Sequence, residues 1–172
     1  HDPHSVILFE PASRALMSAD ALWEAGFGVV FPELEGVDAF DEVANTLDLI
    51  ERLAPQTVIP GHGRPFLEVD AALTSARRRL EGFAAAPQKH ARYAAKVLLK
   101  FKLLEVQQFS QDELFAWSTA TPYLQQLHHA WGRDAAFGDW LGALVDELVS
   151  AGAARLEADD VPEDEAAGLI AA

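Results

Sequence analysis

Three short segments of the sequence each carry a side chain that binds divalent transition metals. These segments are HDPHS at residues 1–5, SAD at 18–20 and PGHG at 60–63. Each lies beside a run that predicts a β-strand, and strand ends let side chains converge without joining the packed core. Imidazole and carboxylate groups are good ligands for Zn, Fe or Mn. The sequence therefore predicts a metal site that uses a histidine of residues 1–5 together with Asp20 and His62.

The elements expected to position these side chains are three short strands. Residues 5–9 (SVILF) form an apolar, β-branched run that ends at the turn-forming residues 10–13. Residues 15–19 are predicted to be the second strand of a hairpin, with Asp20 at its carboxyl end. A short buried strand at 57–59 would present His62 on a glycine-flanked loop.

A loop and a helix separate these strands. Residues 23–32 are rich in glycine and aromatic side chains, which predicts a long loop over a pocket. Asp38 and Asp41 predict an N-cap and N3 pair that opens a helix ending near Leu53. The order strand, strand, helix, strand predicts an α/β layer architecture. So few strands leave a sheet unfinished, and we expect an upstream segment or a partner chain to complete it.

The remainder of the chain has helical periodicity. Residues 67–87 are predicted to be a connecting helix and residues 88–160 a second, helical domain, followed by an acidic, frayed tail at 161–172. Within the second domain we expect helices at 88–107, 110–119, 121–132 and 135–151 and a short strand at 153–157. The segment SQDE at 110–113 is a capping box, and Pro122 stands at a first helical position.

Composition limits the classes of function. The formal net charge is −14, with 27 acidic and 13 basic residues, which argues against binding to a phosphate backbone. The absence of cysteine rules out disulfides and thiolate metal sites and fits a reducing cytoplasm. No apolar run is long enough to span a bilayer. We therefore expect a cytoplasmic protein with a small-molecule substrate, no nucleic-acid or membrane partner, and a possible homo-oligomeric state.

In order, spacing and strand context, the three segments resemble the second half of the metallo-β-lactamase-fold hydrolases. The resemblance covers residues 1–66 and implies an α+β fold, the second half of an αββα sandwich. It implies that His1 binds one metal, that Asp20 bridges two metals as the catalytic carboxylate, and that His62 binds the second. It also implies a pocket or outer ligand shell formed by His4, Trp23, Phe27, Phe31 and Gly61.

This resemblance implies hydrolysis of an ester, thioester or related bond by a water that bridges two metals, with Zn expected and Fe or Mn as alternatives. Ala19 replaces the family's usual glycine, and the family's His-x-His-x-Asp-His motif is absent. We therefore expect the C-terminal part of a hydrolase, inactive alone. The helical part resembles the winged-helix-like extension of some of these hydrolases. The alternative is a non-catalytic protein-interaction or winged-helix binding module; residues 135–151 hold no Lys or Arg, which disfavours DNA recognition.

Overall fold

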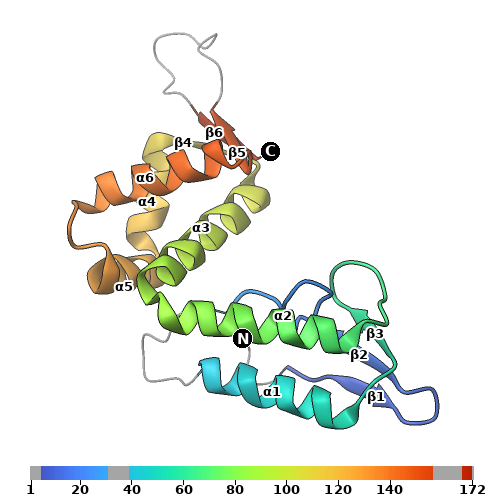
Figure 1. Cartoon of the computed structure of the whole chain (residues 1–172). Coiled ribbons are helices and arrows are strands. Elements are labelled where there is room, and N and C mark those ends of the chain that lie inside the picture. Colours follow the sequence, from blue (N-terminus) through green and yellow to red (C-terminus); the bar gives the residue numbers. More distant parts are fainter. Residues whose placement is uncertain (1–4, 31–38, 157–167, 172) are drawn as a thin grey trace. The chain divides into compact units, whose positions relative to one another are not determined.

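The computed structural model describes residues 5–30, 39–156 and 168–171 of the chain. It divides into two compact units, residues 1–87 and residues 88–172. Helices and strands occur in both units, so the fold is a mixed helix and sheet fold (Figure 1). Asp38, predicted to start a helix, and Phe31, predicted to shape the pocket, lie outside the described residues.

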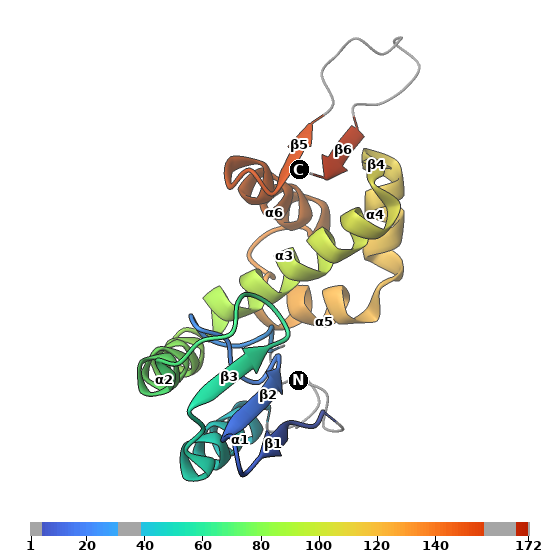
Figure 2. The ribbon, with the colours of Figure 1, turned by 90° about the vertical axis from the view of Figure 1, so that its right-hand side faces the viewer.

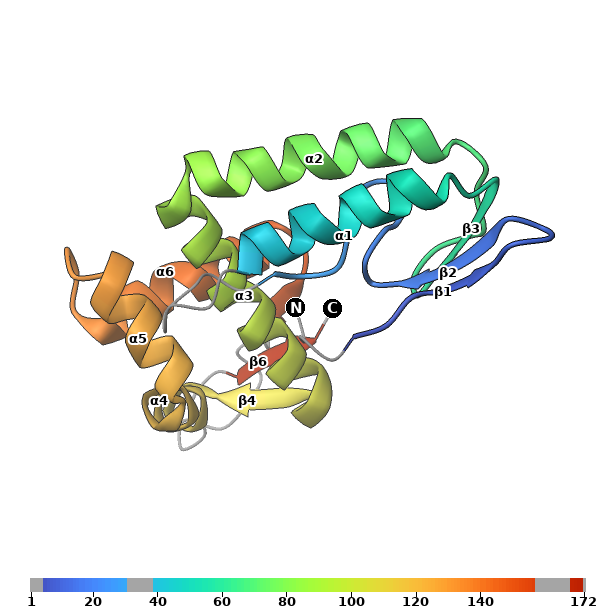
Figure 3. The same cartoon turned by 90° about the horizontal axis from the view of Figure 1, so that it is seen from below.

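The first unit contains a three-stranded sheet with the strand order β1-β2-β3. Strands β1 (Leu8–Glu10) and β2 (Ala15–Ala19) are antiparallel, whereas β2 and β3 (Thr57–Pro60) are parallel. Helices α1 (Ala39–Leu53) and α2 (Val69–Ala85) lie on one side of this sheet (Figures 2 and 3). The hairpin, the helix and the third strand therefore occur where the sequence predicted them.

Side-chain alternation gives this sheet one buried and one exposed face. Leu16 and Val58 are opposite one another and fully buried in the core beneath the helices. That core also contains Leu47 and Ile50 of α1 and Leu73 of α2. Helix α2 thus packs into the first unit and does more than connect two domains. The strand period of two places the neighbouring residues of each strand on the opposite face.

The first strand is shorter than predicted, and β2 has a bulge near its carboxyl end. The sequence predicted a strand at 5–9, but β1 begins at Leu8, which pairs with Met17. The pairing register of β2 with β3 shifts between Met17 and Ala19, and Ala19 has a left-handed backbone with a φ of 46°. A bulge bends its strand. This bulge lies directly before Asp20.

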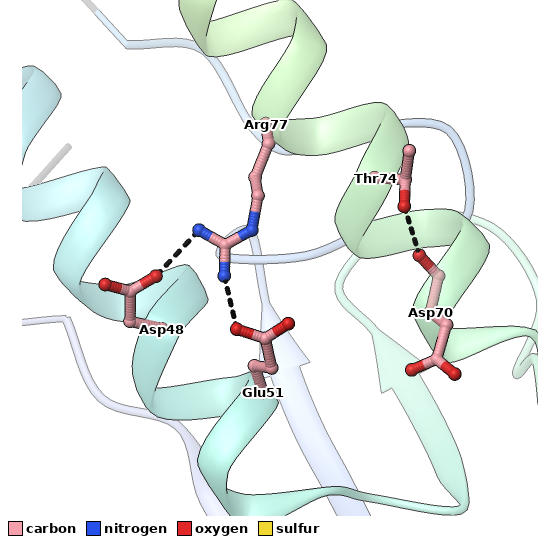
Figure 4. Close-up of polar contacts among 5 residues, drawn as sticks. All are labelled: Asp48, Glu51, Asp70, Thr74 and Arg77. Carbon is pink, nitrogen blue, oxygen red and sulfur yellow. Dashed lines mark hydrogen bonds and ion pairs between the residues drawn. The ribbon is translucent and has the colours of Figure 1, made fainter.

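An arginine fork joins the two helices of the first unit. Arg77 of α2 donates to Asp48 Oδ1 at 2.7 Å and to Glu51 Oε2 at 2.8 Å, both on α1 (Figure 4). The hydrogen bond to Asp48 raises the pKa of Arg77 above its ordinary value. Asp48 and Glu51 are three residues apart, so they lie on the same side of α1. These two ion pairs link α2 to α1 along their facing sides.

The second unit combines four helices with a small antiparallel sheet. The helices are α3 (Pro87–Val106), α4 (Gln111–Ala120), α5 (Pro122–Trp131) and α6 (Phe137–Ser150). The strands β4 (Gln108–Ser110), β5 (Ala154–Leu156) and β6 (Gly168–Ala171) have the order β4-β6-β5. The prediction of a frayed tail is wrong for residues 168–171, because β6 is the central strand and its Leu169 is buried.

Among the described residues, no helix combines the length and the apolar character that crossing a membrane requires.

Ser110 ends β4 and caps α4, which confirms the capping box predicted from the sequence. Its hydroxyl accepts from the Glu113 N–H, and the Glu113 carboxylate accepts from the Ser110 N–H at 2.9 Å. We expect Ser110→Ala to lower the free energy of unfolding by about 1 kcal/mol, measured by urea denaturation. Ser150→Ala at the exposed end of α6 is the control and should change it by less than about 0.5 kcal/mol.

The same cap should give the second unit a pH dependence. The backbone and side-chain hydrogen bonds from Ser110 lower the pKa of Glu113. A carboxyl whose folded pKa is lowered stabilises the fold above its unfolded pKa of about 4.3 and loses that contribution as the pH falls through the folded value. Glu113→Gln should therefore flatten the stability profile between about pH 5 and pH 3. An unchanged profile would contradict the capping role of this carboxylate.

Candidate metal centre

Asp20 and His62 meet at one edge of the first sheet. Asp20 follows β2 and His62 follows β3, and the carboxyl ends of these parallel strands lie side by side. Asp20 Oδ1 and His62 Nε2 are 3.7 Å apart, and the two side chains are 47% and 72% exposed. The structure thus brings together two of the three predicted metal ligands. His1 and His4 lie outside the described residues.

The turn that carries Asp20 is held by its neighbours in the chain. The Ala21 N–H donates to Ser18 O at 2.9 Å, and the buried Ser18 hydroxyl donates to Leu22 O at 2.6 Å. The Gly28 N–H donates to Asp20 O at 2.7 Å, which ties the following loop to the turn. Gly28 lies in the glycine-rich run predicted to be a loop and was not predicted as a site residue, although its position in the Gly-Phe-Gly run was a signal of close packing.

Two glycines lie directly against Asp20. A Cβ atom at Gly28 would be 2.6 Å from Asp20 Cβ, and one at Gly61 would be 2.9 Å from Asp20 Oδ1. The Gly61 N–H also donates to Ala19 O at 2.8 Å. Glycine is required where a backbone approaches so closely. Gly61 was predicted to belong to the site, and in the structure it lies where a Cβ atom would crowd the Asp20 carboxylate.

The His62 loop is closed at its base and is contacted by an aromatic ring. Val58 and Phe66 exchange backbone hydrogen bonds of 2.9 and 3.0 Å, so the intervening residues form a loop on β3. The ring of Trp23 packs edge-on against the His62 ring, with centroids 5.2 Å apart. Trp23 Nε1 is buried and has no hydrogen-bond partner among the described residues. Trp23 thus lies against one side of the exposed His62 ring.

Phe27, predicted to shape the pocket, is a core residue in the structure. It is 1% exposed and packs edge-to-face against Phe83 of α2, with centroids 6.0 Å apart. The guanidinium of Arg79 lies 5.3 Å from the centroid of the Phe27 ring. Phe27 therefore anchors the glycine-rich loop to the helical layer.

Ala19 occupies a backbone conformation that favours glycine. Its φ of 46° places it in the left-handed region, directly before Asp20. This conformation costs an alanine about 1–2 kcal/mol, whereas the added flexibility of a glycine in the unfolded chain costs about 0.4–1 kcal/mol. We therefore expect Ala19→Gly to raise the free energy of unfolding by about 0.5–1 kcal/mol in urea denaturation. Ala21→Gly is the control: Ala21 does not have this left-handed conformation, so the change should lower the free energy of unfolding.

The donor set of this pair fits part of a metal site. Ligand atoms about 2.0–2.2 Å from a tetrahedral metal are about 3.3–3.5 Å apart, close to the Asp20–His62 separation. Both side chains are exposed, so a small rotation brings the atoms to that distance. A catalytic zinc site uses three protein ligands. In the described part of the chain, no group of three or more His, Cys, Asp or Glu side chains could hold a metal ion, so Asp20 and His62 supply two ligands.

Comparison with known proteins finds similarity only at the level of solved structures. No family model matches the chain, and no curated protein matches it. A beta-lactamase domain protein from Burkholderia ambifaria is 21% identical, with a TM-score of 0.38 and 96% of this chain covered. A metallo-beta-lactamase family protein from Thermus thermophilus is 16% identical, with a TM-score of 0.35 and 96% covered. The chain spans 43% and 44% of the length of these two structures.

Proposed function

We propose that this chain is the C-terminal part of a metal-dependent hydrolase whose metal centre includes Asp20 and His62. The observation that carries the proposal is the 3.7 Å separation of Asp20 Oδ1 and His62 Nε2 at the ends of neighbouring parallel strands. In open sheets with parallel strands, ligands bind beyond the carboxyl ends of the strands. Gly28 and Gly61 support this role, because both keep the backbone close behind the Asp20 side chain.

The chemistry of the donors supports the proposed reaction class. A divalent Zn, Fe or Mn ion held by such ligands would lower the pKa of a bound water and polarise the carbonyl of an ester, thioester or related substrate. Asp20 would hold the metal through its carboxylate and His62 through Nε2, with Trp23 against one side of the imidazole ring. In more detail, we propose that the metal centre would hold two metal ions bridged by Asp20, with His1 as a ligand of one ion and His62 as a ligand of the other.

The outer face of the first sheet supports the idea that further ligands come from another layer. Leu8 pairs with Met17, and Met17 pairs with Ile59, so these three side chains form a row across the sheet. They are 59%, 52% and 41% exposed. A sheet with apolar side chains on both faces is typically covered on both. We propose that a second sheet of an αββα sandwich packs here and supplies the remaining metal ligands.

For the second unit we propose a winged-helix-like extension that makes protein contacts. The order α3, β4, α4, α5, α6, β5 and β6, with an antiparallel hairpin at the end, supports this assignment. Helix α6 has Asp139, Asp146 and Glu147 but no Lys or Arg, which supports a protein partner over nucleic acid. A cytoplasmic location is part of the proposal and is supported by the absence of cysteine from the sequence.

Zinc titration of the full chain tests the metal centre. We expect isothermal titration calorimetry to detect Zn²⁺ binding, and Asp20→Asn and His62→Gln each to weaken it by at least about tenfold, since each removes one of few ligands. Asp70→Asn and His129→Gln change exposed residues of the same types outside the site and serve as controls. Equal affinity in the wild type and in both site variants would refute the proposal. The same titration of His1→Gln decides whether His1 is a third ligand.

A further inference from the structure

The second unit contains an apolar groove that is separate from the metal centre. It has a volume of about 410 Å³ and lies between α4 and α6, with the sheet at one end. Leu114 and Phe115 form the α4 wall, and Leu141 and Val145 form the α6 wall. Leu156 of β5 lies at the sheet end. Phe115 and Leu156 are 48% and 53% exposed, so large apolar side chains at this groove contact solvent.

Two glycines keep the α6 side of the groove open. Gly138 and Gly142 are one helical turn apart on α6, and both line the groove. Among the described residues outside its own helical turns, a Cβ atom at Gly142 would meet no atom within 4 Å, and one at Gly138 would approach only Phe115, at 3.6 Å. Packing among these residues therefore does not require glycine at either position. Each glycine inside a helix costs about 0.5–1 kcal/mol relative to alanine.

The charges at this groove have one sign. Asp112 of α4 and Asp146 of α6 line it, and no Lys or Arg is among the described residues that line it. The N-terminal end of α4 is already satisfied, because Ser110 and Glu113 form the capping box there. The two aspartates are thus left to face whatever fills the groove. An occupant with an apolar face and flanking positive charge would complement it.

We propose that this groove docks an amphipathic, basic α-helix of a partner protein. From Gly138 to Val145 the wall is about 10 Å long, or two helical turns at about 1.5 Å per residue. A docked helix would therefore present apolar side chains at positions i, i+3 or i+4, and i+7. Glycines on α6 permit a backbone approach near the lower end of the usual 8–10 Å between helix axes. Lys or Arg residues beside the apolar face would pair with Asp112 and Asp146.

Binding of designed peptides to the full chain tests the docking surface. The probe is a fluorescein-labelled 16-residue helical peptide with Leu at the anchor positions and Lys on the other face. One matched peptide replaces Lys by Glu. A second has the same residues in scrambled order, which keeps its composition and charge but removes the apolar face. In fluorescence anisotropy at near-physiological salt, we expect the basic amphipathic peptide to bind at least tenfold more tightly than either matched peptide. Equal binding of the scrambled peptide would mean that net charge alone attracts it, which would overturn the proposal.

Two pairs of variants locate the binding. Gly142→Leu fills the groove and should weaken binding at least tenfold, whereas Gly82→Leu, at an open helix position of α2, should leave it unchanged. Both changes raise helix propensity, so neither is expected to unfold the chain. Asp146→Lys should weaken binding more than Asp70→Lys does. Wild-type affinity in Gly142→Leu would overturn the proposal. Self-association of the wild-type chain in analytical ultracentrifugation, if Gly142→Leu abolishes it, would also overturn the proposal, because the occupant would then be a second copy of this chain.

Discussion

Gly28→Ala is expected to lower the free energy of unfolding by about 1–3 kcal/mol, the usual cost of overpacking. The new Cβ would be 2.6 Å from Asp20 Cβ and 3.2 Å from the Asp20 carbonyl oxygen, so the backbone of one segment must move. That movement breaks the 2.7 Å hydrogen bond from the Gly28 N–H to Asp20 O. Because the displaced residue is a proposed metal ligand, Zn²⁺ affinity should fall together with stability.

Gly82→Ala is the matched control for this experiment. It makes the same chemical change inside α2, where a Cβ atom meets nothing within 4 Å. Its higher helix propensity should raise the free energy of unfolding by about 0.5–1 kcal/mol. Hydrogen exchange with mass spectrometry, followed on peptides from the first unit, measures the change in stability in both variants. If the two variants change hydrogen exchange in the same direction, the close approach of Gly28 to Asp20 is not the cause of the stability change in Gly28→Ala.

The second large effect concerns the core beneath the sheet. Leu47 of α1 is fully buried with Leu16 and Val58, so Leu47→Ala removes contacts and leaves a cavity. Such a change costs about 2–5 kcal/mol. Leu49, on the same helix, is 40% exposed, and Leu49→Ala should cost less than about 1 kcal/mol.

Hydrogen exchange of peptides covering residues 39–60 gives the readout for this pair. Since Leu47 packs within the first unit, protection should fall there and remain unchanged in α5 and α6 of the second unit. Equal losses in both variants would show that burial does not determine the effect. Loss of protection throughout the chain would show instead that the two units unfold together.

Local patterns in the sequence determined most of the helices and strands. Helix α1 and the capping box at Ser110 occur where they were predicted, because both depend on residues within a turn or two of one another. Strand β6 was missed, since Gly168–Ala171 is short, follows an acidic run and gains its order by pairing with β4 and β5. Pairing between distant segments leaves little trace in the sequence of either one.

For the candidate site, the sequence determined the chemistry, and the tertiary structure decided the arrangement. Residue type made Asp20 and His62 metal-competent, and the strand patterns placed them at strand ends. Only parallel pairing of β2 with β3 brought their side chains to 3.7 Å. Phe27 became a core residue because α2 packs over the glycine-rich loop, and Gly28 gained its role through contact with Asp20. These distances depend on how separate elements pack, which periodicity in the sequence does not encode.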